Sequence, residues 1–183
     1  RFKRRSWEAH LYLAYHAAFP LTLTPDLLYS LRANFSHYSN GEPFDIPWIT
    51  VADLLLSDLC NEVSRELYEI DVSVRNVLLE ELKAYPRFGV QRIHELSNFL
   101  FAYIEHQQPY NIQPFNKNFD RELKWTALAY TKPNEAAYKL ARALLTSLEQ
   151  HDTAEQIRLS ALIETFAEPF TSVGLAPLIT YVY

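Results

Sequence analysis

The sequence predicts a mainly helical, all-α protein whose N-terminal half carries one short β-hairpin. Apolar residues recur at helical spacing along most of the 183 residues, residues 67–70 break that period with strand-like alternation, and capping residues precede the periodic segments. The chain is 49% hydrophobic and 14% aromatic, which is too apolar for a disordered protein. We therefore expect packed helices with a core of their own.

Two helices are expected at the start of the chain. Ser6 is a candidate N-cap for a helix that runs to about Phe19. Thr24 and Pro25 form an N-cap and N1 pair for a second helix that runs to about Phe35, because proline is tolerated where the amide has no helical partner.

The third helix and the hairpin follow. A helix from Trp48 to Leu59 is predicted by the spacing of its apolar residues, Ile49, Ala52, Leu55, Leu56 and Leu59. The polar pair Ser64-Arg65 can turn, and it precedes the alternating residues 67–70, so a short hairpin is expected here.

A fourth helix begins after the hairpin. Asp71 can accept from the free amides of the next turn and is the expected N-cap of a helix to Tyr85. Its apolar stripe is expected to contain Val74, Val77, Leu78 and Leu82. Leu67 or Ile70 of the hairpin should pack against this stripe.

The order of these elements predicts a winged-helix-like N-terminal half. A helix, an extended link at 21–23, two helices, a hairpin and a further helix follow one another as in a winged helix. A trailing helix after 86–89 should bury Val90, Ile93, Leu96, Leu100, Tyr103 and Ile104. We expect this subdomain to span 1–108.

The rest of the chain, 109–183, is expected to form a helical-hairpin or repeat-like bundle. The stretch 107–118 is rich in proline, glutamine and asparagine and marks the boundary. Three helices joined by short links follow. Their expected apolar faces are Phe119, Leu123, Ala127 and Tyr130; Ala137, Leu140, Ala141, Leu144 and Leu148; and, after a cap at Asp152 or Thr153, Ile157, Ala161, Leu162 and Phe166.

The sequence contains no pattern typical of a catalytic, cofactor or metal site. None of the six histidines stands in an H-E-x-x-H arrangement, one cysteine cannot form a C-x-x-C pair, and three glycines cannot build a phosphate loop. Glu66, Glu69 and Asp71 form an acidic cluster that could do acid–base work, but a solvated wing plus a helix cap explains it. We expect no enzyme, no cofactor and no metal.

Charge argues against nucleic-acid binding. The formal net charge is −5, and the expected helix 48–59, which would enter the groove, has Asp53 and Asp58 but no lysine, arginine or histidine. The basic residues Arg1, Lys3, Arg4 and Arg5 leave open an alternative in which the N-terminus binds nucleic acid.

Several features favour a protein partner and a cytoplasmic location. The single cysteine, Cys60, fits a reducing compartment, and no apolar run reaches membrane-spanning length. The chain lacks methionine and ends in an apolar segment, so we expect a piece of a longer polypeptide. The expected interaction residues are Trp48, Leu178, Ile179, Tyr181 and Tyr183.

The sequence also resembles a segment of large multidomain cyanobacterial proteins. The resembling stretches are Arg4–Pro20, Leu23–Tyr29, Ile46–Ile49, Ala52–Leu56, Glu66–Glu69, Arg75–Asn76, Trp125–Tyr130 and Glu164–Pro169. The resemblance implies a connecting or effector-associated module beside STAND-type NTPase, caspase-like, TIR, WD-repeat or tetratricopeptide domains of signalling or conflict systems. The run 66–75 is similar to the winged helix of STAND-type ATPases, but the histidine of that segment would fall near Asp71 and is absent.

These observations predict a non-catalytic protein-interaction or signal-relay module of a larger signalling or defence protein. Its partner would be a neighbouring domain of the same chain or a second copy. A nucleic-acid-binding winged helix is the first alternative. The second is a hydrolase that uses Glu66, Glu69 or a histidine.

Overall fold

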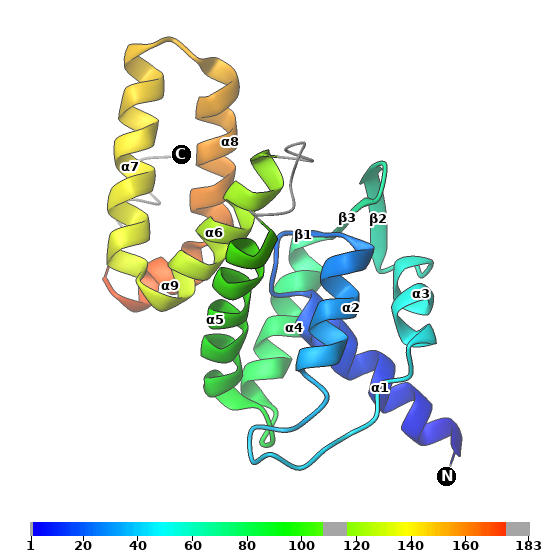
Figure 1. Ribbon diagram of the computed structural model, residues 1–183. Coiled ribbons are helices and arrows are strands. Elements are labelled where there is room, and N and C mark those ends of the chain that lie inside the picture. The colour runs from blue at the N-terminus through cyan, green and yellow to red at the C-terminus, as the bar shows by residue number, and fades with distance from the viewer. Residues whose placement is uncertain (1, 108–116, 175–183) are drawn as a thin grey trace. The chain divides into compact units, whose positions relative to one another are not determined.

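The computed structural model describes residues 2–107 and 117–174, and its elements are coloured along the chain in Figure 1. Contacts divide the chain into a first unit that ends at Leu123 and a second unit that begins at Lys124. The described part is mainly helical and contains one small antiparallel sheet, as predicted.

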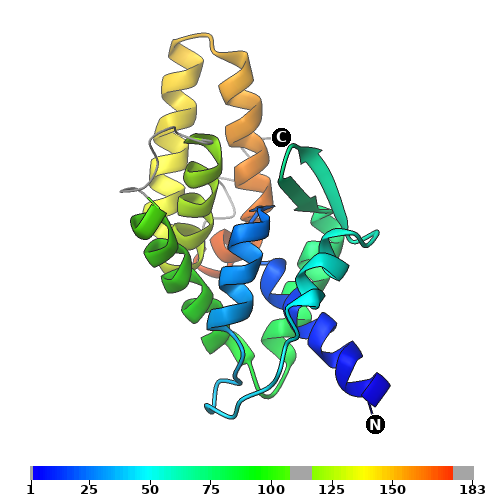
Figure 2. The same cartoon turned by 45° about the vertical axis from the view of Figure 1, so that its right-hand side comes forward.

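The first unit contains the sheet and the winged-helix elements. Its elements are α1 (Phe2–Ala17), β1 (Thr22–Leu23), α2 (Pro25–Asn34), α3 (Ile49–Leu55), β2 (Cys60–Ser64), β3 (Leu67–Ile70), α4 (Val72–Ala84) and α5 (Gly89–Gln107). The sheet order is β1-β3-β2, with both pairs antiparallel. This element order and sheet order are those of a winged helix, and Figure 2 shows the β2–β3 hairpin projecting beside α3.

Helix α1 supplies the centre of the first unit. Nearly every residue from Ala9 to Phe19 is buried, and α1 contacts α2, α3 and α4. The helix begins at Phe2, so the predicted cap at Ser6 was wrong: Ser6 lies inside the helix. Because α1 packs on three helices, most of its circumference is apolar rather than a single stripe.

Two helices of the first unit, α2 and α4, begin at side-chain caps. The Thr24 hydroxyl accepts from the amide of Leu27 across 3.1 Å with Pro25 at the first helical position, as predicted for α2. The Asp71 carboxylate accepts from the amides of Ser73 and Val74 and caps α4, which confirms the second predicted cap.

The hairpin turns at Arg65 and Glu66, one residue after the predicted pair Ser64-Arg65, because Ser64 is still part of β2. Glu66 has φ 58°, in the left-handed region that favours glycine, and its amide donates to the carboxylate of Glu62 across 3.3 Å. A β-bulge between Glu62 and Ser64 inserts Val63 into β2. Ile70 pairs with Cys60 at the base of the hairpin, and both are buried.

Several of the predicted apolar faces differ in part from the buried ones. On α4 the buried residues are Arg75, Leu78, Leu79 and Leu82, whereas Val74 and Val77 are exposed. The α5 face is as predicted at Ile93, Leu96, Leu100 and Ile104, but Val90 is exposed. The predicted helix from Trp48 to Leu59 ends at Leu55, and its inner face is Thr50, Val51 and Leu54.

The second unit contains a helical hairpin. Helix α6 (Lys117–Thr131) includes the boundary between the units, and α7 (Pro133–Glu149), α8 (Thr153–Thr165) and the unpredicted α9 (Ala167–Ser172) follow it. Figures 1 and 2 show α7 and α8 side by side and antiparallel. Asp152 caps α8 through the amide of Glu155, but Leu159 and Ile163 are buried where Ile157 and Ala161 were expected.

The link between α7 and α8 is tight although it contains no glycine. His151 has φ 55°, its amide donates to Leu148, and the amide of Asp152 donates to Ser147. These two hydrogen bonds form a Schellman motif, which satisfies carbonyls that a helix end leaves without partners. The motif reverses the chain within three residues and so fixes the hairpin.

Candidate protein-docking surface

Helix α3 is held against α1 and α2 by one side of its short length. It begins after Pro47, whose carbonyl accepts from the amide of Thr50, and it ends where the Ser57 hydroxyl donates to the carbonyl of Leu54 across 2.7 Å. Thr50, Val51 and Leu54 are buried. These anchors fix which side of the helix faces outward.

The outward side of α3 is apolar. Ile49, Ala52, Asp53 and Leu56 follow one another at i, i+3, i+4 and i+7, which places them on one face of the helix. Leu56 is 87% exposed, Ile49 is 45% exposed and the preceding Trp48 is 64% exposed. We call Trp48, Ile49 and Leu56 the α3 surface. Large exposed apolar side chains along one helix face are typical of docking sites.

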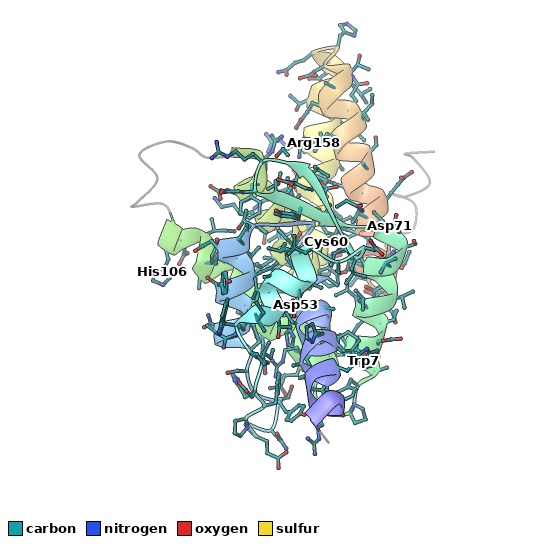
Figure 3. The ribbon with its side chains drawn as sticks, turned by 90° about the vertical axis from the view of Figure 1, so that its right-hand side faces the viewer. Trp7, Asp53, Cys60, Asp71, His106 and Arg158 are labelled. Carbon is teal, nitrogen blue, oxygen red and sulfur yellow. The ribbon has the colours of Figure 1, made fainter. Side chains whose placement is uncertain are left out.

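One exposed carboxylate, Asp53, lies on the same helix face as the α3 surface. Asp53 Oδ2 lies 2.9 Å from Nε2 of His10 on α1, and both side chains are partly exposed. Figure 3 shows Asp53 on α3 beside α1, with Trp7 nearer the N-terminal end of α1. Trp7 is itself 69% exposed. The hydrogen bond connects α3 to α1. Helix α3 itself contributes no cation to this face, because it contains no basic residue.

The β2–β3 hairpin does not add a basic surface. Glu62 and Glu66 lie on either side of Arg65 in its exposed tip, and Val63 at the bulge is half exposed. A wing that contacts phosphate needs an excess of cations. This tip has an excess of one carboxylate and presents an apolar side chain at its bulge.

The three carboxylates of the acidic cluster are separated in role. Glu66 occupies the turn, and Asp71 caps α4. The hydrogen bonds that Asp71 accepts from Ser73 and Val74 lower the pKa of its carboxyl group. The pKa of Glu69 is raised, mainly by burial and then by the nearby carboxylate of Glu122. Among the described residues no group of three histidine, cysteine or acidic side chains is placed to hold a metal ion.

Cys60 and His16 are buried and carry groups of the kind that a hydrolase uses. Burial raises the pKa of the Cys60 thiol to about 11, so the thiol is protonated and unreactive at neutral pH. Burial lowers the pKa of His16 to about 3, and its ring is neutral. Neither side chain is accessible to a substrate.

The predicted interaction residues have different outcomes. Trp48 lies on the exposed α3 surface, whereas Leu178, Ile179, Tyr181 and Tyr183 lie outside the described residues. Sequence reasoning assigned Ile49 and Leu56 to a periodic stripe without stating which side it faces. Thr50, Val51 and Leu54 form a second set with helical spacing, and these are the residues that are buried. Periodicity alone does not show which of the two sets faces the core.

Within the described ranges, no helix has both the length and the apolar character needed to cross a membrane. Comparisons with protein-family models, with curated proteins and with solved structures find no significant match to this chain.

Proposed function

We propose that this chain is a non-catalytic protein-interaction or signal-relay module of a larger multidomain signalling or defence protein. The observation that carries the proposal is the α3 surface. In this element order α3 takes the place of the helix that reads DNA in many winged helices, and here its exposed face carries apolar side chains and one carboxylate but no cation. Such a face suits a protein partner.

The chemistry of the α3 surface supports this role. Tryptophan is enriched at interface hot spots, because one side chain covers a large area and retains a polar N–H. Trp48 lies next to Ile49 in the chain, and Leu56 is almost fully exposed one helix length away. The partner would be a neighbouring domain of the same polypeptide or a second copy, in the cytoplasm.

A site-specific photo-crosslinker tests the proposal. Benzoylphenylalanine would replace Leu56 in the parent protein, expressed in its own cells, and in a matched control it would replace Ile157, which is 67% exposed on α8. We expect a nuclease-resistant protein crosslink from position 56 that a second change, Trp48→Ser, removes. A crosslink of equal yield from position 157, or none from position 56, would contradict docking through α3.

A further inference from the structure

A cavity of about 730 Å³ opens in the first unit beside the start of α3. Its volume is in the range of pockets that bind small molecules and single side chains. The cavity has an aromatic floor and a charged rim. The floor is Tyr12, Tyr38 and Phe44, and the charged rim is Glu8, Glu42, Asp45 and Arg87. Pro47, which precedes Trp48, also lines it.

The floor is a cluster of packed aromatic rings. The Tyr12 ring packs edge-on against Tyr38 and Phe44, with centroids 5.9 and 5.0 Å apart. The Tyr12 hydroxyl bonds to that of Tyr85 across 2.7 Å and accepts from Tyr38 across 3.4 Å. Burial and these neighbouring hydroxyls raise the pKa of Tyr12, so its phenol stays neutral. A neutral aromatic floor attracts cations through its ring faces.

The chain already places one guanidinium in this cavity. Arg87 lies with its guanidinium carbon 4.5 Å from the centroid of the Tyr38 ring, and its Nη1 is 3.7 Å from the Glu42 carboxylate. This arrangement shows that the aromatic floor and a rim carboxylate can hold a planar cation together.

One rim carboxylate remains available. Asp45 is exposed and has no hydrogen-bond or ion-pair partner among the described residues. The cavity is lined by three carboxylates, Glu8, Glu42 and Asp45, and by one cation, Arg87, so its lining has a net negative charge. Phe44 beside it is only partly buried and presents aromatic surface. A carboxylate next to an aromatic ring fits the forked donors and flat face of a second guanidinium.

We infer that this cavity binds an arginine side chain of the docking partner, with Asp45 accepting its N–H groups and Phe44 contacting its face. The inference rests on the proposed docking function and deepens it, because Pro47 joins the cavity to the α3 surface. The partner segment would thus place an apolar face on α3 and an arginine in the adjacent cavity.

An NMR titration of the whole chain tests this with a defined probe. The probe is acetyl-arginine methylamide, and its matched control is the citrulline analogue, which has the same shape without the charge. We expect the arginine probe to shift the amides of 42–45 and 87, and the citrulline analogue to leave them unchanged. Asp45→Asn should weaken binding about tenfold, and Glu164→Gln, an exposed carboxylate on α8, should not.

Two results would overturn the inference. One is equal binding of the citrulline analogue or of acetyl-lysine methylamide, because the site would then not select a guanidinium. The other is unchanged arginine binding in Asp45→Asn. Leu56→Ser should bind the probe like the wild type, since the probe has no apolar face. If position 56 gives no crosslink but the arginine probe still binds, the docking function is overturned. If the crosslink forms but the probe does not bind, only the arginine site is overturned.

Discussion

The Arg92 guanidinium donates from Nη1 to Nε2 of His16 across 3.2 Å, and both side chains are completely buried. Since Nε2 accepts, the ring proton lies on Nδ1 and donates to the carbonyl of Tyr12. Arg92 also donates to the carbonyl of His37 across 2.6 Å and pairs with Glu95 at 2.9 Å. The network joins α1, α5 and the loop after α2.

Acid should destabilise the protein through His16. Burial, with a smaller contribution from Arg92, lowers the pKa of His16 from 6.5 to about 3. Between these values the unfolded chain binds a proton that the folded chain does not, so stability falls as pH decreases below 6.5 and is unaffected above it. The slope for one proton is at most about 1.4 kcal/mol per pH unit.

Denaturant unfolding at several pH values from about 7 to about 5 measures this effect, above the range where most carboxylates titrate. His16→Gln is the matched variant, because the glutamine amide can still donate to Tyr12 and accept from Arg92. We expect its slope to be smaller than that of the wild type. Identical slopes would show that His16 does not set the pH dependence.

The base of the hairpin should tolerate no charge. Ile70 is 6% exposed on β3, so Ile70→Asp buries a carboxylate and removes apolar contacts. The expected loss in unfolding free energy is at least about 2–5 kcal/mol. Thermal melts measure the loss, and Val63→Asp on β2 is the control at an exposed position. Equal melting temperatures for the two variants would mean that Ile70 is not part of the core.

The cap of α4 should depend on an oxygen acceptor rather than on charge. Asp71 accepts from the amides of Ser73 and Val74, and Asp71→Ala removes both bonds. We expect Asp71→Ala to lower the unfolding free energy and Asp71→Ser to restore most of it, because serine also caps helices. Urea titrations compare the three proteins. A serine variant as unstable as the alanine variant would assign the carboxylate another partner.

The two faces of α3 should respond differently to truncation. Leu54 is buried, so Leu54→Ala should cost about 2–5 kcal/mol of stability. Leu56→Ala should change stability by no more than about 0.5 kcal/mol, since Leu56 has little to lose on truncation. Chemical denaturation measures both. A large loss in Leu56→Ala would place this residue in the fold and withdraw it from the α3 surface.

Nucleic acid should bind weakly or not at all. Helix α3 has no cation, and the hairpin tip carries one arginine between two glutamates. Fluorescence anisotropy with a labelled duplex at two salt concentrations measures the binding. Affinity that falls steeply with salt, and that disappears when Lys3, Arg4 and Arg5 become glutamine, would instead support the basic N-terminus as a nucleic-acid site.

The sequence by itself determined the features that depend on neighbours in the chain. Thr24 and Asp71 cap helices as predicted, Asp152 is the cap of the two candidates Asp152 and Thr153, and the hairpin turns at 65–66, within one residue of the predicted pair. Each of these depends on hydrogen bonds or backbone angles within a few residues, so residue type and spacing are sufficient to predict it. The element order that identifies the winged helix follows from them.

Only the tertiary structure decided which faces are buried and which positions meet. Helix α3 has apolar residues on both sides, and its packing on α1 and α2 selects Val51 and Leu54 for the core and leaves Leu56 outside. Arg75 and Arg92 are charged, yet both are buried, because distant carbonyls at Phe19 and His37 accept from them. The cavity beside the start of α3 is likewise lined by side chains from three separated segments of the chain. Such burial depends on partners far along the chain, which periodicity within one helix does not encode.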